Sequence, residues 1–516
     1  MNENQKVTRA AGIIGIGTLA SRILGFVRDM ILAWFFGAGK LSDAFFVAFR
    51  IPNLLRRLLA EGTLTLAFIP VFAEYLENFG RNEAFEMARS AIRTLSAVLA
   101  IVTIAGVAGA PILVYIVAPG FTGDAYDITV TLTRIMFPYV FFICLVALAM
   151  GILNTMGHFA APAFAPVLLN IGIITGALVI APMMVTPVYG LAAGVIIGGV
   201  LQLMLQFPFL TRKGFRFWES APLYHPGIKK IAYLMGPAVF GAAVYQVNIL
   251  VGTMLASLLP EGSVSYLYYA DRLVQFPLGI FAISTSVAVL PSLSRQAAAK
   301  DFAALENTFA FAMRFVFFVT IPSTIGLIVL KEPIIALLFG RGAFDAASIH
   351  MTAYALLYYA VGLCAFSAVR IVVSTFYALQ DTKTPVKMAT LSIIANILLG
   401  IALMGPMAHG GLALATSLAS IINFALLTQA LKSRIGGLAW KNIVVTAARS
   451  LVSSLVMGAV LLFFLKRFPP DCQGSGFYLL FYVICAIVAG GAIYLAASLV
   501  LQRNELRAVA HIVRKP

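Results

Sequence analysis

Charged side chains are scarce in this sequence, making up 11% of its 516 residues, against roughly 25% in a soluble globular domain. Acidic residues are the scarcer sign, with 20 Asp and Glu against 36 Lys and Arg, so the formal net charge is +16. Hydrophobic residues make up 61%. Apolar runs of about 20 residues, long enough to cross a bilayer as helices, recur from end to end. The composition excludes a soluble domain and predicts an all-α, polytopic membrane protein.

Cysteine and histidine are also rare. The four cysteines, Cys144, Cys364, Cys472 and Cys485, have no CxxC or metal-ligand spacing, and the five histidines are scattered. Such cysteines are typical of packing positions in apolar segments. The sequence therefore predicts no metal, no cofactor and no redox chemistry.

Breaks between the apolar runs divide the chain into about fourteen expected transmembrane helices. The first seven are expected at roughly 8–36, 42–76, 90–118, 128–153, 162–182, 188–211 and 228–259. The second seven are expected at roughly 264–293, 308–338, 346–379, 385–404, 410–432, 442–465 and 477–501. With the N-terminus inside, the inner segments hold 23 Lys and Arg and the outer loops hold 5. Because cytoplasmic loops retain basic residues, both termini are expected in the cytoplasm.

Three short patterns recur at almost the same separation. Ala48-Phe-Arg50 and Ala270-Asp-Arg272 lie 222 residues apart, and Ile69-Pro70 and Leu290-Pro291 lie 221 apart. Gly190-Leu-Ala-Ala and Gly411-Leu-Ala-Leu are also 221 apart. The proline pairs are expected to close equivalent helices. Such a repeat predicts two six-helix lobes, 1–215 and 216–436, around a central cavity, followed by two extra helices in 437–516.

Eight arginines fall inside expected spans: Arg22, Arg28, Arg50, Arg56, Arg57, Arg134, Arg272 and Arg370. Each costs about 2.5 to 3.5 kcal/mol near the bilayer centre, so most need a partner or a wet cavity. Snorkelling from a helix end is the alternative, and it is favoured for Arg134 and weighs evenly for Arg50 and Arg370.

The spacing of these charges indicates which of them face each other. Arg22 and Asp29 are seven residues apart and share one helix face, while Arg57 and Glu61 have the i,i+4 spacing of an ion pair. Nearby carboxylates are fewer than the arginines: Asp29, Asp43, Glu61 and Asp271. Guanidinium groups bind phosphate oxygens in pairs. The surplus predicts an anionic, phosphate-bearing substrate, since a cation or drug antiporter would need free carboxylates.

Several of these charged stretches resemble one known family. They are Ser21-Arg-Ile-Leu-Gly-Phe-Val-Arg-Asp29, Ser42-Asp-Ala-Phe-Phe-Val-Ala-Phe49, Pro52-Asn-Leu-Leu-Arg-Arg-Leu-Leu-Ala-Glu-Gly62, Phe68-Ile-Pro-Val-Phe-Ala-Glu-Tyr75, Tyr268-Tyr-Ala-Asp-Arg-Leu273, Leu290-Pro-Ser-Leu-Ser294 and Phe376-Tyr-Ala-Leu-Gln-Asp-Thr-Lys-Thr-Pro385. Together they closely resemble the MurJ (MviN) lipid II flippase family, within the multidrug, oligosaccharidyl-lipid and polysaccharide exporter superfamily.

The resemblance implies a flippase, and not an enzyme, that moves lipid II to the periplasmic leaflet of the bacterial inner membrane by alternating access. It implies a cationic cavity between the lobes, a polyprenyl-tail groove formed by the last two helices, and no nucleic-acid partner; we expect a monomer. The substrate-binding residues it implies are Arg22, Arg28, Asp29, Asp43, Arg56, Asp271 and Arg272, with possible support from Arg50, Arg57 and Glu61.

Three alternatives to lipid II flipping stay open at this stage. One is a flippase for another lipid-linked oligosaccharide, and one is a cation-coupled multidrug exporter. An enzyme acting on polyprenyl diphosphate is disfavoured, because the sequence has no DDxxD-like cluster. Some family members carry an acidic sodium ligand in helix seven, where this chain has only Asn248 as a strongly polar candidate. Sodium coupling is therefore not expected.

Overall fold

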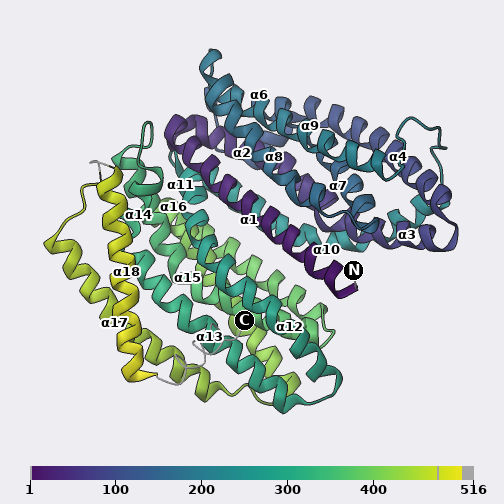
Figure 1. Cartoon of the computed structure of the whole chain (residues 1–516). Helices are drawn as coiled ribbons and strands as arrows, with labels where there is room; N and C mark the ends of the chain where they lie inside the picture. Colours follow the sequence, from purple (N-terminus) through teal and green to yellow (C-terminus); the bar gives the residue numbers. More distant parts are fainter. Residues whose placement is uncertain (1–2, 473–475, 503–516) are drawn as a thin grey trace. The chain divides into compact units, whose positions relative to one another are not determined.

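The computed structural model describes the backbone of residues 3–472 and 476–502. Within these residues, the side chains of 3–11, 60–63, 66, 237–238, 240–242 and 244–245 are not described. The described part of the chain is built of helices joined by short connections, with no strand (Figure 1). The predicted all-α fold is confirmed.

Two compact units divide the chain, Met1–Gly262 and Ser263–Pro516, and each is described by itself. These two units are separated by how densely each is packed within itself. The lobes expected at 1–215 and 216–436, and the extra helices expected in 437–516, were inferred from a sequence repeat. Those three boundaries stay predictions.

Among its described residues, the first unit contains ten α-helices, two π-helical segments and one 3-10 helix. They are α1 (Glu3–Phe36), α2 (Lys40–Leu55), η1 (Arg56–Leu64), α3 (Thr65–Asn78), α4 (Arg81–Ala108), α5 (Ala110–Val117), α6 (Gly123–Met136), α7 (Tyr139–Thr155), α8 (Ala160–Thr175), η2 (Gly176–Ile180), η3 (Ala181–Met183), α9 (Val188–Arg212) and α10 (Pro226–Ser257). The helix α1 packs along α8, and α8 packs along α9 (Figure 1).

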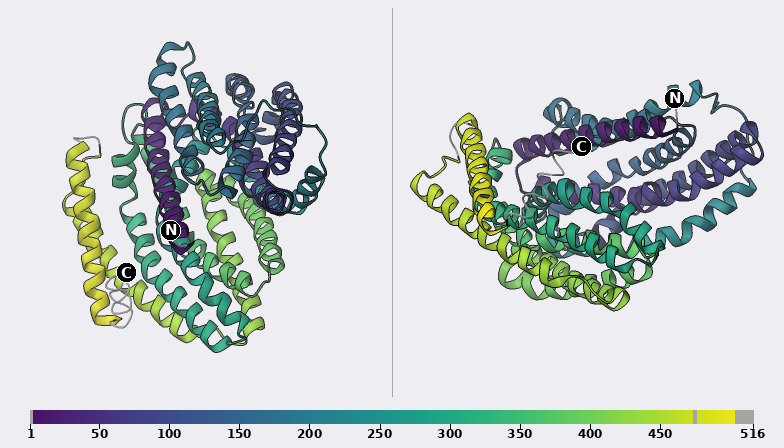
Figure 2. Two further views of the ribbon diagram at one scale, coloured as in Figure 1. Left: turned by 45° about the vertical axis from the view of Figure 1, so that its right-hand side comes forward. Right: turned by 60° about the horizontal axis from the view of Figure 1, so that its bottom comes forward.

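The second unit has fewer but longer helices. They are α11 (Ser263–Pro277), η4 (Leu278–Ile283), α12 (Ser284–Ala298), α13 (Phe302–Val329), α14 (Lys331–Phe339), α15 (Ala346–Ala378), α16 (Lys383–Ile435), α17 (Trp440–Arg467) and α18 (Gly476–Leu501). An apolar core joins α12, α13, α15 and α16. The two last helices, coloured yellow-green and yellow in Figure 2, pack on each other, and Tyr494 of α18 donates its hydroxyl to the Phe318 carbonyl of α13 at 2.6 Å.

Ten helical segments are long and apolar enough to cross a membrane, among the residues that could be searched. The ten segments do not include α1, the run from α2 to α3, or α10, each of which was expected to span the membrane. The helix α16, where two spans were expected, is one of the ten segments. Two helices meet within α16 at Ala408, whose φ of 47° and ψ of −133° are not helical. The multi-pass fold is confirmed, while the number fourteen stays a prediction.

The internal repeat is visible in the backbone of each unit. The π-helical segments η1 and η4 begin at Arg56 and Leu278, 222 residues apart. A Cβ on Gly190 would lie 2.5 Å from the Ala181 nitrogen, and a Cβ on Gly411 would lie 2.2 Å from the Leu403 carbonyl oxygen. Each glycine thus lets a helix approach the end of the preceding one, which a side chain would prevent.

One expectation from the repeat is wrong. Pro70 and Pro291 do not close their helices, because α3 continues to Asn78 and α12 continues to Ala298. Proline removes one backbone donor, and helices in membranes tolerate this where other groups satisfy the freed carbonyl.

Candidate functional site: guanidinium groups in apolar helices

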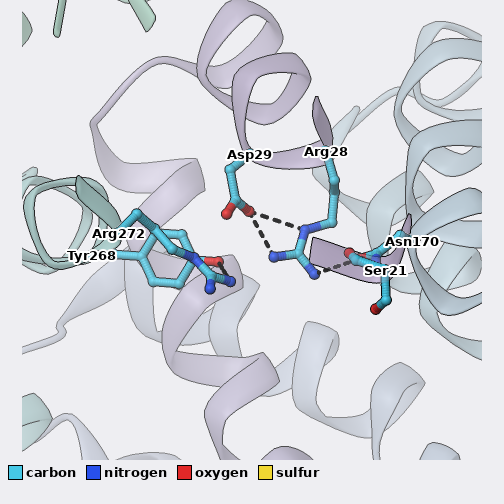
Figure 3. A network of polar contacts seen from close by, with 6 residues as sticks. All are labelled: Ser21, Arg28, Asp29, Asn170, Tyr268 and Arg272. Atoms are coloured by element: carbon cyan, nitrogen blue, oxygen red, sulfur yellow. Dashed lines mark hydrogen bonds and ion pairs between the residues drawn. The ribbon is translucent and has the colours of Figure 1, made fainter. Parts of the chain in front are cut away.

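Arg28 on α1 is a buried charged group of the first unit with several hydrogen bonds. Its Nε and Nη2 atoms donate to the same oxygen of Asp29, at 3.0 and 2.7 Å, and its Nη1 atom donates to Oδ1 of Asn170 at 3.1 Å (Figure 3). The Arg28 residue is 7% exposed and Asp29 is fully buried. Burying a guanidinium is tolerable only because these acceptors replace water.

Asn170 connects α8 to two parts of α1. Besides accepting from Arg28, its Nδ2 donates to the Ser21 carbonyl at 3.1 Å (Figure 3). Asn170 lies close to the backbone of α1 at Gly25, where a Cβ would be in van der Waals contact with its Nδ2 at 3.6 Å. The amide therefore fixes both the backbone of α1 and the direction of the Arg28 guanidinium.

Arg22 lies on the same helix but in a different environment. Its side chain is exposed, as are its neighbours Ile23 and Val27. The predicted shared face of Arg22 and Asp29 follows from the unbroken helix between them. The two residues differ in burial, so only the Asp29 end of this face is packed inside the first unit.

The arginines of α2 and η1 are half-buried. Arg50 donates to the Thr253 hydroxyl of α10, and the Arg56 Nε donates to Oδ1 of Asn53 at 2.8 Å. Arg57 is also half-buried. The side chain of Glu61 lies outside the described residues, so the ion pair expected between Arg57 and Glu61 stays a prediction.

Asp43 and Glu261 make a reciprocal pair of contacts at the ends of two segments of the first unit. The buried Asp43 accepts from the Gly262 backbone nitrogen at 2.7 Å, while Glu261 accepts from the Lys40 backbone nitrogen at 2.7 Å. Lys40 is the first residue of α2. Each carboxylate satisfies a backbone donor that a helix start or turn leaves without a partner. The predicted site residue Asp43 thus has a structural contact of its own.

In the second unit, Arg272 of α11 is held by a residue one turn earlier. Its Nη2 donates to the Tyr268 hydroxyl at 3.0 Å, and its guanidinium carbon lies 5.2 Å from the centre of the same ring (Figure 3). Asp271 accepts a long hydrogen bond of 3.5 Å from Gln275. A guanidinium held by an aromatic ring and a neutral hydroxyl retains its positive charge.

Sequence reasoning missed the neutral partners of these arginines. Asn170, Tyr268, Asn53 and Thr253 carry no charge, and three of them lie within long apolar or aromatic stretches. Asn170 offered one signal, because a lone amide in the apolar run of 160–175 needs a hydrogen-bond partner. Tyr268 offered another, since its spacing of four from Arg272 places both on one helix face.

No group of three or more His, Cys, Asp or Glu side chains within the described part of the chain could hold a metal ion. The arrangement can instead bind anions, because arginine presents several N–H donors in a plane that fits phosphate or carboxylate oxygens. The roles expected for Arg22, Arg28, Asp29, Asp43, Arg56, Asp271 and Arg272 stay predictions.

Known proteins resemble this chain over nearly its whole length. A family profile described as the lipid II flippase MurJ matches residues 32–484. A lipid II flippase MurJ of Burkholderia cenocepacia is 40% identical over 428 residues, 81% of this chain and 82% of the relative. A probable lipid II flippase MurJ of Vibrio cholerae is 37% identical over 468 residues, 89% of either chain.

Solved structures give the same picture of the fold. A lipid II flippase MurJ in an inward closed conformation superposes with a TM-score of 0.80 at 28% identity, covering 96% of this chain and 99% of that one. An inward-facing multidrug resistance MATE transporter of the MOP superfamily has a TM-score of 0.68 at 14% identity, covering 81% of this chain and 95% of that one, which shows a shared fold alone. The resemblance stated from the sequence is confirmed: this chain belongs to the MurJ family of lipid II flippases.

Proposed function

We propose that this protein carries lipid II, an undecaprenyl-diphosphate-linked muropeptide, from the cytoplasmic to the periplasmic leaflet of the bacterial inner membrane. The observation that carries the proposal is the buried guanidinium of Arg28, bound by Asp29 and Asn170 inside an apolar helix pair. Membership of the MurJ family supports lipid II as the substrate. A diphosphate supplies the paired anionic oxygens that guanidinium groups bind best.

The substrate diphosphate binds to Arg22, Arg28, Arg56 and Arg272 in this proposal. Arg28 keeps its contact with Asn170, which positions the guanidinium, while a phosphate oxygen accepts from the same group, because a guanidinium carries five N–H donors. Asp29 stays in place and keeps the guanidinium oriented. Asp43 and Asp271 belong to the same substrate-binding set. Arg50, Arg57 and Glu61 support the geometry of the helices that carry these arginines.

Transport proceeds by alternating access, as expected for a protein built from two repeats. We expect both termini in the cytoplasm and a monomer, with the polyprenyl tail lying along α17 and α18. A potential that is negative inside favours outward movement of an anion by about 2.3 kcal/mol per charge per 100 mV. The same potential opposes the return of an empty site that is cationic.

Depleting the protein from cells distinguishes this function from its alternatives. We expect lipid II to accumulate and the cells to lyse, because wall synthesis loses its precursor outside. Accumulation of a different lipid-linked oligosaccharide, with normal lipid II, would indicate another flippase. Drug sensitivity with normal wall synthesis would indicate a multidrug exporter. Either of these two outcomes rejects the proposal.

Complementation of the depleted cells then tests the site. Arg272→Ala is expected to insert and be expressed but not to restore growth, because the substrate loses a cation. Arg370→Ala is the matched control, since Arg370 is exposed and belongs to the same unit. Normal growth of Arg272→Ala cells would show that the site assignment is wrong.

A further inference from the structure

A segment of the first unit between α9 and α10 is fixed along α4 by hydrogen bonds. This segment, residues 213–225, is here termed the linker. Arg81 donates to the Lys213 carbonyl, Arg89 donates to Glu219 at 2.5 Å, and Ser90 donates to the Pro222 carbonyl at 2.6 Å. Because these contacts follow one another along both α4 and the linker, the linker runs beside the first turns of α4.

The C-terminal part of the linker is also held to α4 by hydrogen bonds. Arg93 donates to the Ala221 carbonyl, and Thr94 donates to the Leu223 carbonyl at 2.5 Å. The buried His225 accepts from the Gly227 nitrogen through Nδ1 at 3.1 Å, so its Nε2 carries the hydrogen and faces Glu83 at 3.3 Å. The linker is therefore an ordered surface.

Aromatic side chains of the linker divide into two groups. Phe215 is fully buried and packs edge to face on Phe85 and on Phe217, with ring centres 5.3 and 5.0 Å apart. Trp218 and Tyr224, by contrast, point outward and are 74% and 72% exposed. Leu223, which directly precedes Tyr224, is 66% exposed. A segment fixed in place thus presents three large apolar side chains away from the protein.

The position of these side chains along α4 places them at a membrane boundary. No charged residue occurs from Thr94 to Ala118, and a helix needs about 20 such residues to cross the hydrocarbon core. Thr94, where this stretch begins, contacts Leu223. Trp218 directly precedes Glu219, and Glu219 contacts Arg89 of α4. Arg89 lies five residues before Thr94 on this helix, more than one turn further from the apolar stretch. Leu223 therefore lies at the edge of the hydrocarbon and Trp218 at the level of the headgroups.

The linker and the residues beside it in sequence carry a net positive charge, with Lys230 paired to Glu74 at 2.5 Å. Residues 212–230 contain five basic side chains, Arg212, Lys213, Arg216, Lys229 and Lys230, and one acidic side chain, Glu219. Arg89 neutralises Glu219 at 2.5 Å, so the exposed Arg216, whose Nη1 lies 3.4 Å from Glu219, adds a positive charge to this surface. Exposed cations beside tryptophan and tyrosine match the chemistry of an anionic membrane surface.

We propose that the linker, with the ends of α9 and α10 that flank it, is a docking site for anionic phospholipid headgroups. Leu223 and Tyr224 lie at the edge of the hydrocarbon and Trp218 among the headgroups, while Arg216 of the linker, Arg212 of α9 and Lys229 of α10 bind their phosphates. The site fixes the level of α4 and α9 in the leaflet on this side. The experiments that test this site measure lipid contact and do not require translocation. If they fail, the proposed function is unaffected.

Fluorescence of single-tryptophan variants in vesicles tests the depth of the linker. The chain has three tryptophans, so Trp34→Phe with Trp440→Phe leaves Trp218 alone. We expect nitroxide lipids labelled near the headgroup to quench Trp218 more than lipids labelled deep in the chain. Leu223→Trp, with the three native tryptophans replaced by Phe, should be quenched more by the deeper label than Trp218 is. A Trp218 that a water-soluble quencher reaches equally with and without lipid would overturn the proposal.

The charge requirement is tested with vesicles of phosphatidylcholine alone or mixed with phosphatidylglycerol. We expect the anionic lipid to increase shallow quenching of Trp218 and salt to reverse the increase. Combined Arg212→Gln, Arg216→Gln and Lys229→Gln substitutions should abolish the increase. The control is Lys466→Gln with Arg467→Gln, which removes charge at the far end of α17. Quenching that does not depend on the anionic lipid would overturn the assignment of the ligand, as would an equal loss in the control.

Discussion

Arg28 of α1 donates through Nη1 to the side-chain amide oxygen of Asn170 on α8, at 3.1 Å, across 142 residues of sequence. The same amide donates to the Ser21 carbonyl. A neutral residue thus fixes a charged one within the apolar interior of the first unit, and this contact gives the most specific prediction of the structure.

Asn170→Leu is expected to lower lipid II translocation by about tenfold or more, because a hydrogen bond to a charged group contributes about 1.5 to 3 kcal/mol. Asn170→Asp should keep the fold stable but also lower translocation, since a second carboxylate neutralises the guanidinium that the substrate needs. Rates in vesicles and thermal stability in detergent measure the two effects. Thr133→Val is the control. Thr133 is buried, and its hydroxyl donates to the Thr129 carbonyl of its own helix. Normal translocation by Asn170→Leu would exclude a positioning role.

Tyr268 holds Arg272 in two ways, by a hydrogen bond to its hydroxyl and by a cation–π contact with its ring. Tyr268→Phe removes the hydroxyl at 3.0 Å but keeps the ring 5.2 Å from the guanidinium carbon, whereas Tyr268→Ala removes both. The cation–π interaction contributes about 0.5 to 2 kcal/mol, so Tyr268→Ala should lower translocation several-fold more than Tyr268→Phe. Equal rates for the two variants would show that the ring does not hold Arg272.

The connection between α15 and α16 gives a prediction about pH. The Asp381 carboxylate accepts from the Thr384 nitrogen at 3.0 Å, the Thr384 hydroxyl at 2.7 Å and Arg434 at 3.1 Å. The Thr384 hydrogen bonds and then the Arg434 charge lower the pKa of Asp381 below its usual value. A lowered pKa stabilises the folded state above the unfolded pKa of about 3.9, and this contribution is lost as pH falls through the folded value.

Thermal unfolding in detergent measures this contribution. Asp381→Asn should unfold at a lower temperature than the wild type at neutral pH, and the difference should disappear below the lowered pKa of Asp381. Thr384→Val should reproduce part of the loss. A difference between wild type and Asp381→Asn that persists unchanged in acid would contradict the pKa assignment.

Sodium dependence is a further expectation. The stretch from Ile231 to Leu259 has no Asp or Glu, and its strongly polar candidate is Asn248. A sodium ion binds best to carboxylate oxygens supplemented by neutral ones, so replacing sodium by potassium in vesicles should not change translocation. A rate that falls with sodium removal and is restored by sodium alone would show that neutral oxygens are sufficient here.

Much of the fold could be predicted from the sequence because charge and hydropathy act locally. The apolar runs predicted the helices, and the offset near 222 residues predicted an equivalence now seen in η1 and η4. The proline positions misled, since Pro70 and Pro291 lie inside continuing helices. Charged motifs identified Arg28, Asp29 and Arg272, but not what holds them. Asn170 lies 142 residues from Arg28, and no local pattern reports a contact formed by packing of α1 on α8.

The central claim is that guanidinium groups in the apolar helices bind the lipid II diphosphate, and Arg28→Ala tests it most directly. Purified wild-type protein in vesicles should translocate lipid II. Arg28→Ala should lower the rate by at least about tenfold, because the buried Asp29 loses the guanidinium that pairs with it and the substrate loses a cation. Arg134→Ala, which removes an exposed arginine of the same unit, should stay within about twofold. Lipid II translocation by Arg28→Ala at the wild-type rate would contradict the account.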